Sequence, residues 1–135
     1  MTPRIGDIFQ VPLPDGRFAY GKVFRDASVG IYETIFDTPA SLPIKSSFVF
    51  IVGLYADILK SGAWPIVGHE AFASADEEWP PPHFIKDVIS GEYSLYHKGI
   101  IRPSSETECR GLEQAAVWDA DDIIDRILRS EQYLN

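Results

Sequence analysis

Strand-like segments fill most of the first 97 residues of this 135-residue sequence, and its clearest amphipathic helix comes only at the end. Strands followed by helices, rather than alternating with them, are typical of an α+β domain with an antiparallel sheet. A chain of this length fits one domain, because domains usually hold roughly 100 to 200 residues. The sequence therefore predicts a single α+β domain over residues 1–135, with a strongly bent, mainly antiparallel and partly barrel-like sheet.

The first two strands are expected to form a hairpin over residues 6–25. Two runs rich in Phe, Val, Ile and Tyr flank Pro14-Asp15-Gly16, in which proline presets one turn φ and glycine tolerates a left-handed conformation. Alternation after the turn predicts a strand with one buried face and one wet face. Gly21 within this strand indicates a bulge or a close approach of another chain segment.

Further strands are expected along the middle of the chain. The nearly continuous apolar run at 47–54 predicts a strand that is buried on both faces and lies at the centre of the sheet. The pattern at 55–62 predicts a short middle helix, and a second hairpin is expected around the Ser90-Gly91 turn. Two more strand candidates lie at 29–36 and 64–68.

The final helix is expected to begin after Asp119, a natural N-cap, and to pack on the sheet through the apolar stripe Ile123, Ile124, Ile127 and Leu128. Arg126 and Arg129 are placed near its C-terminal end, where positive charge complements the helix dipole. A calcium loop starting at Asp119 is excluded, because Ile124 stands where such a loop needs glycine.

Charge is divided unevenly between the two halves of the chain. The sequence holds 20 acidic and 12 basic residues, a net charge of −8, whereas residues 1–67 hold six of each and are neutral. The second half therefore carries the whole acidic excess. Such a charge disfavours binding to nucleic acid or to an anionic membrane and favours encounter with a basic protein partner.

Cysteine content and hydropathy point to the cytoplasm. Cys109 is the only cysteine, so no internal disulfide is expected, and a buried structural thiol is the simplest interpretation. The first residues lack the apolar run of a signal peptide. The longest mainly apolar stretch, 48–56, is far shorter than the roughly 20 residues of a membrane-spanning helix.

No motif in the sequence indicates catalysis, a metal or a cofactor. His69, His83 and His97 are spaced unlike any known set of metal ligands, and the glycine-rich loops that bind nucleotides do not occur. An enzyme of an unrecognised type would be tested first by replacing His97 or Glu92. The sequence favours a binding protein over an enzyme.

The loop before the three consecutive prolines holds the candidate partner-binding residues. Consecutive carboxylates precede a large aromatic side chain, and Trp is common in interface hot spots while acidic groups speed encounter with basic partners. The residues are Asp76, Glu77, Glu78 and Trp79, with Glu70 in support. The alternative is a solvated acidic loop whose Trp79 folds back on the core.

Three segments, in order, resemble the immunity protein 26 family of bacterial polymorphic toxin systems. They are GDIFQVPLPDGRFAYGKV at 6–23, FIVGLYADILKSGAWPIVG at 50–68 and GLEQAAVWDADDIIDRI at 111–127. The resemblance implies a small cytoplasmic antidote without catalysis that binds and neutralises the C-terminal domain of a cognate toxin. It assigns no residue roles. An acidic second half is consistent with a basic partner such as a nuclease, whose active site the protein would block.

The composition also allows a second class of function, the binding of a small molecule or a peptide. Aromatic-rich strands can line a pocket for a small molecule or a peptide, because pocket walls are typically aromatic with a few polar groups. The candidates for such a pocket are Tyr32, Tyr93, Tyr96 and Trp64. A ligand of this kind would raise thermal stability in a screen, whereas an immunity protein should respond to its toxin.

Overall fold

A computed structural model describes residues 2–134, with side chains up to residue 131. Its strands are β1 (Asp7–Pro12), β2 (Phe18–Val23), β3 (Ser28–Tyr32), β4 (Phe48–Leu54), β5 (Ile66–His69), β6 (His83–Lys86), β7 (Tyr93–His97), β8 (Ile100–Ser104) and β9 (Val117–Trp118). Its helices are α1 (Asp57–Lys60), α2 (Glu106–Cys109) and α3 (Ala120–Leu134), with a 3-10 turn, η1, at Asp76–Glu78. The α+β class is confirmed.

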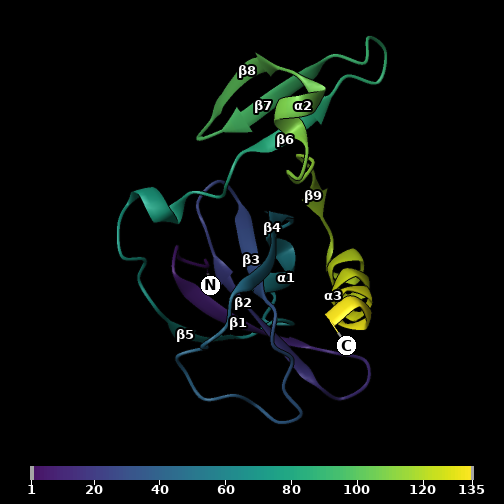
Figure 1. The fold of residues 1–135 in the computed structure, drawn as a ribbon. Helices are drawn as coiled ribbons and strands as arrows, with labels where there is room; N and C mark the ends of the chain where they lie inside the picture. Colours follow the sequence, from purple (N-terminus) through teal and green to yellow (C-terminus); the bar gives the residue numbers. More distant parts are fainter. Residues whose placement is uncertain (1, 135) are drawn as a thin grey trace.

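The strands form two sheets rather than one (Figure 1). A six-stranded sheet has the order β5-β1-β2-β3-β4-β9, and a three-stranded sheet has the order β6-β7-β8. Neighbouring strands are antiparallel except β4 and β9. The six-stranded sheet ends at β5 and β9, so it does not close into a barrel. No helix in the described part of the chain is long and apolar enough to cross a membrane.

The predicted first hairpin is confirmed, with β1 and β2 joined in an antiparallel register. Gly21 stands opposite Phe9, and a Cβ on Gly21 would lie 2.3 Å from the Phe9 ring, so this glycine permits a close approach and not a bulge. The expected wet face of β2 is wrong. Ala19, Tyr20 and Lys22 are all buried, because other segments cover both faces of the sheet.

Two apolar cores lie on opposite faces of the six-stranded sheet. The first core is closed by α1, Trp64 and α3, and its buried members are Phe9, Val11, Leu13, Ala19, Val29, Ile31, Phe50, Val52, Leu54, Leu59, Trp64, Ile123 and Ile127. The second core is closed by the segment that joins β3 to β4, and its buried members are Ile8, Tyr20, Tyr32 and Ile44. Burial on both faces explains why this sheet can hold so many apolar residues.

The expected position of the 47–54 strand is wrong. It is present as β4, but it lies next to the edge, and β2 and β3 form the centre of the sheet. The expected burial on both faces is also wrong, because Phe50, Val52 and Leu54 on one face are buried whereas Val49, Ile51 and Gly53 on the other are half-buried. The predicted strands at 29–36 and 64–68 and the helix at 55–62 are present as β3, β5 and α1, with shifted ends.

The second hairpin is confirmed as β6 and β7, but sequence reasoning missed β8 and α2. Lys98 and Gly99 both have positive φ, at 53° and 78°, which is the geometry of a two-residue hairpin turn between β7 and β8. Ser105 then caps α2 by accepting a hydrogen bond from the Glu108 amide. Cys109, at the end of α2, is buried, which the sequence alone did not decide.

The N-cap of the final helix is confirmed, since Asp119 Oδ1 accepts a hydrogen bond from the Asp122 amide at 2.9 Å. The expected place of the two arginines near the helix end is wrong, because α3 continues to Leu134. Arg126 lies in the middle of α3 and stacks over Phe50 and Trp118, with ring centroids 4.2 and 5.1 Å away. It also pairs with Glu113, which ties α3 to the segment before β9.

Candidate partner-binding site

Residues 70–82, named the acidic strap here, run from the six-stranded sheet to the three-stranded sheet (Figure 1). The η1 turn places Asp76 and Glu77 in solvent and leaves Glu78 and Trp79 half-buried. Glu70 is exposed at the start of the strap, just after β5. The candidate residues thus share one connecting segment that touches both sheets.

Two carboxylates of the strap have cations from other elements as partners. Asp76 pairs with Lys98 of the β7–β8 turn, and this hydrogen bond lowers the pKa of Asp76. Arg25, just after β2, brings its Nε within 2.8 Å of Glu78 Oε1 and donates its backbone N–H to the Glu78 carbonyl at 2.8 Å. These pairs hold the strap against both sheets.

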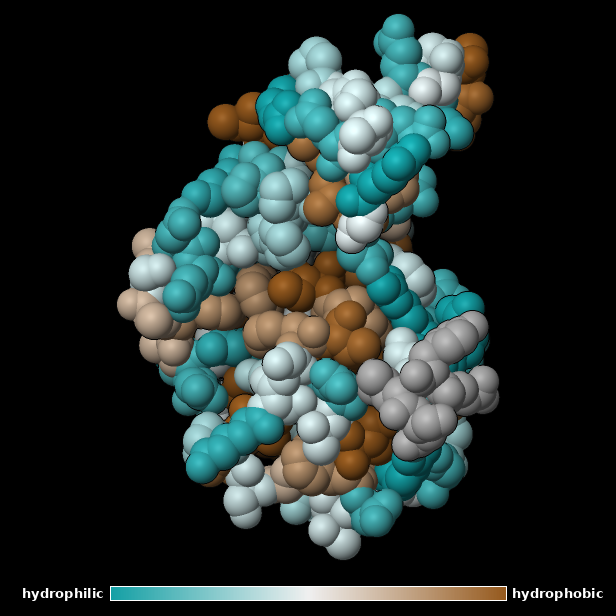
Figure 2. All heavy atoms as spheres, in the orientation of Figure 1, coloured by the Kyte–Doolittle hydropathy of each residue, from teal (hydrophilic) through white to brown (hydrophobic). Residues whose placement is uncertain are grey.

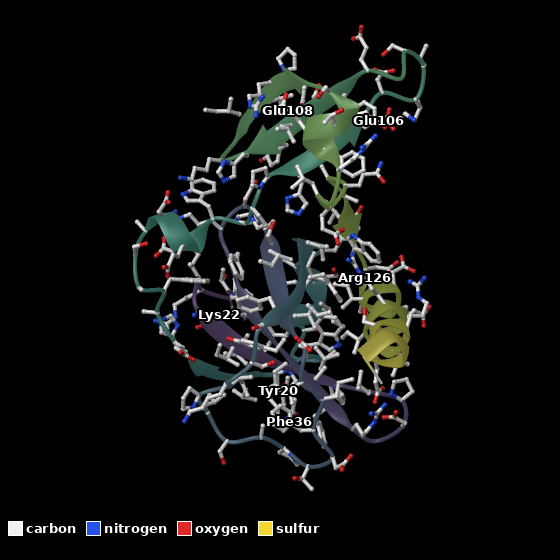
Figure 3. All side chains as sticks on the ribbon, viewed as in Figure 1. Tyr20, Lys22, Phe36, Glu106, Glu108 and Arg126 are labelled. Atoms are coloured by element: carbon white, nitrogen blue, oxygen red, sulfur yellow. The ribbon has the colours of Figure 1, made fainter. Side chains whose placement is uncertain are left out.

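The other two carboxylates act on a buried lysine. Lys22 lies on β2 (Figure 3). It is 7% exposed, and its Nζ lies 3.9 Å from the centroid of the Phe72 ring. Burial lowers the pKa of Lys22, and the charges of Glu70 and Glu77 oppose that shift. Burial and, secondarily, the Glu70 charge raise the pKa of Tyr32 to about 12. Lys22 was not identified from the sequence as part of the site, although a lysine inside an apolar strand indicates a buried cation.

Trp79 forms one wall of a hollow of about 440 Å³ beside the strap. The floor comes from the N-terminal segment, the end of β2 and α1. The Arg25 guanidinium lies 5.6 Å from the centroid of the Trp79 ring and fixes the indole against the body of the protein. This hollow is mainly apolar.

A second hollow, also about 440 Å³, separates the two sheets. Pro80, Pro81, Tyr96 and Lys98 line it on one side, and the segment before β9 lines it on the other. His83 bridges the sheets here, with Nε2 at 2.9 Å from the Ile51 carbonyl and Nδ1 at 2.7 Å from the Pro81 carbonyl. The second hollow is therefore framed by the strap and by both sheets.

The turn between β2 and β3 forms a ridge between the two hollows, because Asp26, Ala27 and Ser28 line both. Asp26 and Ala27 have positive φ, 65° and 51°, a conformation that residues with a Cβ adopt at a cost. Tyr96 Oη donates a hydrogen bond to Asp26 Oδ2 at 2.6 Å, which raises the pKa of Tyr96. A strained turn held in this way is typical of binding sites.

A family model for immunity protein 26 matches residues 4–95, more than half of the chain. The chain belongs to the immunity protein 26 family. The match includes β1 to β5, the strap, β6 and the first three residues of β7. No curated protein and no solved structure matches the sequence. Membership implies a protein that confers immunity to a toxin by binding it, a class of protein that is generally not catalytic.

In this immunity protein 26 member, the four aromatic residues considered for a small-molecule pocket do not come together. Trp64 stacks on Phe9 in the first core, and Tyr32 stacks on Phe48 in the second. Tyr93 and Tyr96 lie three positions apart on β7 and so point to opposite faces. Only Tyr96, at the second hollow, borders a cavity described above. The prediction of one pocket built from all four is wrong.

The three histidines of this immunity protein 26 member lie in separate places. His69 contacts buried Asp7 through Nδ1 at 2.8 Å, His83 bridges the sheets, and His97 lines the second hollow. Within residues 2–134, no group of three or more His, Cys, Asp or Glu side chains could hold a metal ion. Glu92 precedes β7 and His97 ends it, so the two residues considered for catalysis stand at opposite ends of one strand.

Proposed function

We propose that this protein acts in the cytoplasm as an immunity protein that binds the C-terminal domain of its cognate toxin and covers the toxin's active site. Family membership over residues 4–95 is the observation that carries the proposal. Inhibition is steric and electrostatic, and it uses no cofactor, metal, nucleic acid or membrane. The whole chain, residues 1–135, works as one domain.

The acidic strap and its two hollows are the proposed contact surface. Glu77 is exposed, and Trp79 borders an apolar hollow that can receive a side chain from the partner. Hot spots form where an aromatic anchor and a desolvated pocket lie within a polar rim. The carboxylates of the strap supply such a rim, and the ridge at Asp26 is already held in shape before binding.

The proposed toxin is a basic domain, and a nuclease is the class that fits best. The chain carries a net charge of −8, and Asp76, Glu77 and Glu78 place three of its carboxylates together in the strap. Carboxylates can occupy positions where a nuclease holds phosphates, and opposite charge speeds encounter.

Contacts between the two sheets support a single working unit. His83 reaches the Ile51 carbonyl of β4, and Tyr96 reaches Asp26 in the turn between β2 and β3. The chain also passes from the three-stranded sheet to β9, which pairs with β4. The proposed domain therefore includes both sheets, and thermal unfolding followed by circular dichroism and by tryptophan fluorescence should give one shared transition.

Binding is tested with a catalytically inactive C-terminal domain of the toxin encoded next to this protein's gene. The triple variant D76N/E77Q/E78Q should weaken binding about 10- to 100-fold, mainly through slower association, and should flatten its dependence on salt. The matched control D57N/D121N/D125N changes the net charge equally on another surface and should bind within about threefold of the unchanged protein.

The outcomes of this experiment separate the parts of the proposal. If the unchanged protein does not bind the toxin domain, the antidote function is rejected. If it binds and both triple variants bind alike, the strap is not the contact surface. An acidic toxin domain would reject the nuclease assignment. Thermal unfolding of each variant shows whether the fold is intact.

A small-molecule or peptide site is the second candidate function. The observation in its favour is the size of the two hollows, about 440 Å³ each, which lies within the roughly 300–1,000 Å³ of ligand pockets. A thermal-shift screen of metabolites and short peptides tests it, because a ligand that binds the folded chain raises its melting temperature. Bulky variants of Ala27 on the ridge should abolish any such shift.

A further inference from the structure

The tip of the β6–β7 hairpin presents two apolar side chains to solvent. Val88 is 98% exposed and Ile89 is 94% exposed, and Figure 2 shows hydrophobic surface at this tip, far from the six-stranded sheet. Single exposed apolar residues are ordinary on protein surfaces, but two adjacent ones at a projecting tip form a patch. We name residues 87–92 the apolar finger.

Hydrogen bonds hold the finger in one conformation. Asp87 Oδ1 accepts from the amides of Ile89 at 2.8 Å and Ser90 at 3.0 Å. The Asp87 carbonyl accepts from the Gly91 amide at 2.8 Å, and Gly91 has a positive φ of 75° that closes the turn. The Glu92 carbonyl accepts from the Asp87 amide, which joins the two ends of the finger.

A rigid finger with these side chains is suited to insertion. Val and Ile are branched at Cβ and lose little rotamer freedom when they become buried. The backbone is already ordered, so binding does not have to order it. A hairpin tip that contacts no partner usually consists of polar residues and glycine. This tip instead carries the apolar residues Val88 and Ile89.

Charges beside the finger indicate what surrounds it in a complex. The amides of Ser90 and Ile89 lower the pKa of Asp87, which keeps this carboxylate ionised. Glu92 is exposed at the other end of the finger. The nearby cation, Lys86, lies over the Tyr93 ring, with Nζ 5.6 Å from its centroid. An apolar tip between two carboxylates complements an apolar cleft with a cationic rim.

We infer that the apolar finger inserts into an apolar cleft with a cationic rim on the toxin domain, as a second contact outside the acidic strap. This inference rests on the proposed function. The finger and the strap lie on different segments, so two separate contacts would hold the toxin. Such a pair of contacts raises affinity beyond that of either one, because the second forms within an existing complex.

The test compares two double variants on the three-stranded sheet, with the inactive toxin domain as the probe. V88D/I89D should raise the Kd about 100-fold or more, as expected for charges placed in an apolar anchor. The matched control I100D/I101D alters two residues on β8 that are 68% and 61% exposed, and its Kd should stay within about threefold. Both variants should keep the melting temperature, because the replaced side chains are exposed.

Each other outcome overturns the inference. If the unchanged protein does not bind the toxin domain, the proposed function and the finger both fail. If it binds and V88D/I89D binds equally well, the finger alone fails. Self-association that V88D/I89D abolishes, measured by sedimentation without an effect on toxin binding, would assign the finger to a second copy. Co-sedimentation with phosphatidylcholine–phosphatidylglycerol vesicles, lost in V88D/I89D while toxin binding is kept, would assign it to lipid.

Discussion

The six-stranded and the three-stranded sheets bury their residues in different ways. The six-stranded sheet has an apolar core on each face, with Phe9, Val11 and Ile31 fully buried. In the three-stranded sheet, the buried residues of the strands are Leu95 and His83, and isoleucines of β8 are exposed. Three strands without a deep core are close to the lower limit of independent stability.

The difference in burial indicates that the two sheets have different roles. The six-stranded sheet supplies most of the apolar burial that stabilises the fold. The three-stranded sheet is held to it by polar links at His83 and Tyr96 and presents the apolar finger to solvent. Binding surfaces are commonly drawn from the less stable part of a protein.

The largest expected effect is on the free energy of unfolding, and it is measured by removing one aromatic ring from each sheet. Phe9→Ala removes a fully buried ring that stacks on Trp64 and should lower the free energy of unfolding by about 3–5 kcal/mol. Phe84→Ala on β6 removes a half-buried ring and should cost roughly 1 kcal/mol. Urea unfolding measures both. Equal losses would contradict the division between a stabilising sheet and an attached one.

A smaller effect is expected at the link between the sheets. His83→Leu leaves the Ile51 and Pro81 carbonyls without their partner and should cost about 1–3 kcal/mol. Amide hydrogen exchange should become faster in β6, β7 and β8 while β1 to β3 keep their protection. His97→Leu, also on the three-stranded sheet, serves as the control. Uniformly faster exchange would show that the sheets open together.

Burial in the second core predicts a loss of stability at high pH. The pKa of Tyr32 is raised from about 10 to about 12, mainly by burial. Its contribution to stability is therefore complete below pH 10 and is lost as the pH rises through 12. Urea unfolding at a series of pH values should show this decline, and Tyr32→Phe should show less of it. An identical profile in both proteins would contradict deep burial of this ring.

The smallest effect is expected for the Lys98–Asp76 pair. Lys98→Gln should leave the melting temperature at pH 7 unchanged, because the two side chains are 36% and 79% exposed and water screens their attraction. The pKa of Asp76, which this pair lowers, should return toward its ordinary value of 3.8 in an NMR titration. A clear fall in melting temperature would make this pair a structural link like His83.

Prediction from sequence succeeded where the signal is local. The Pro14-Asp15-Gly16 hairpin and the Asp119 cap are both confirmed. The Lys98-Gly99 turn was an equally local signal and would have revealed β8. Predictions failed where they depended on distant segments. One face of β2 was expected to be exposed to solvent, but the sequence of a strand does not show which other segments will cover that face.

The candidate site was predictable only as a segment. Its acidic residues and Trp79 stand together in the sequence, whereas the cations near them come from β2, from Arg25 in the β2–β3 turn and from the β7–β8 turn. The sequence by itself determined the hairpins, the last helix and the acidic excess, because turn geometry, periodicity and charge are properties of short segments or of composition. Tertiary structure alone decided the division into two sheets, the hollows and the partners of each carboxylate. These depend on which distant residues become neighbours, and such pairings are set by packing of the whole chain.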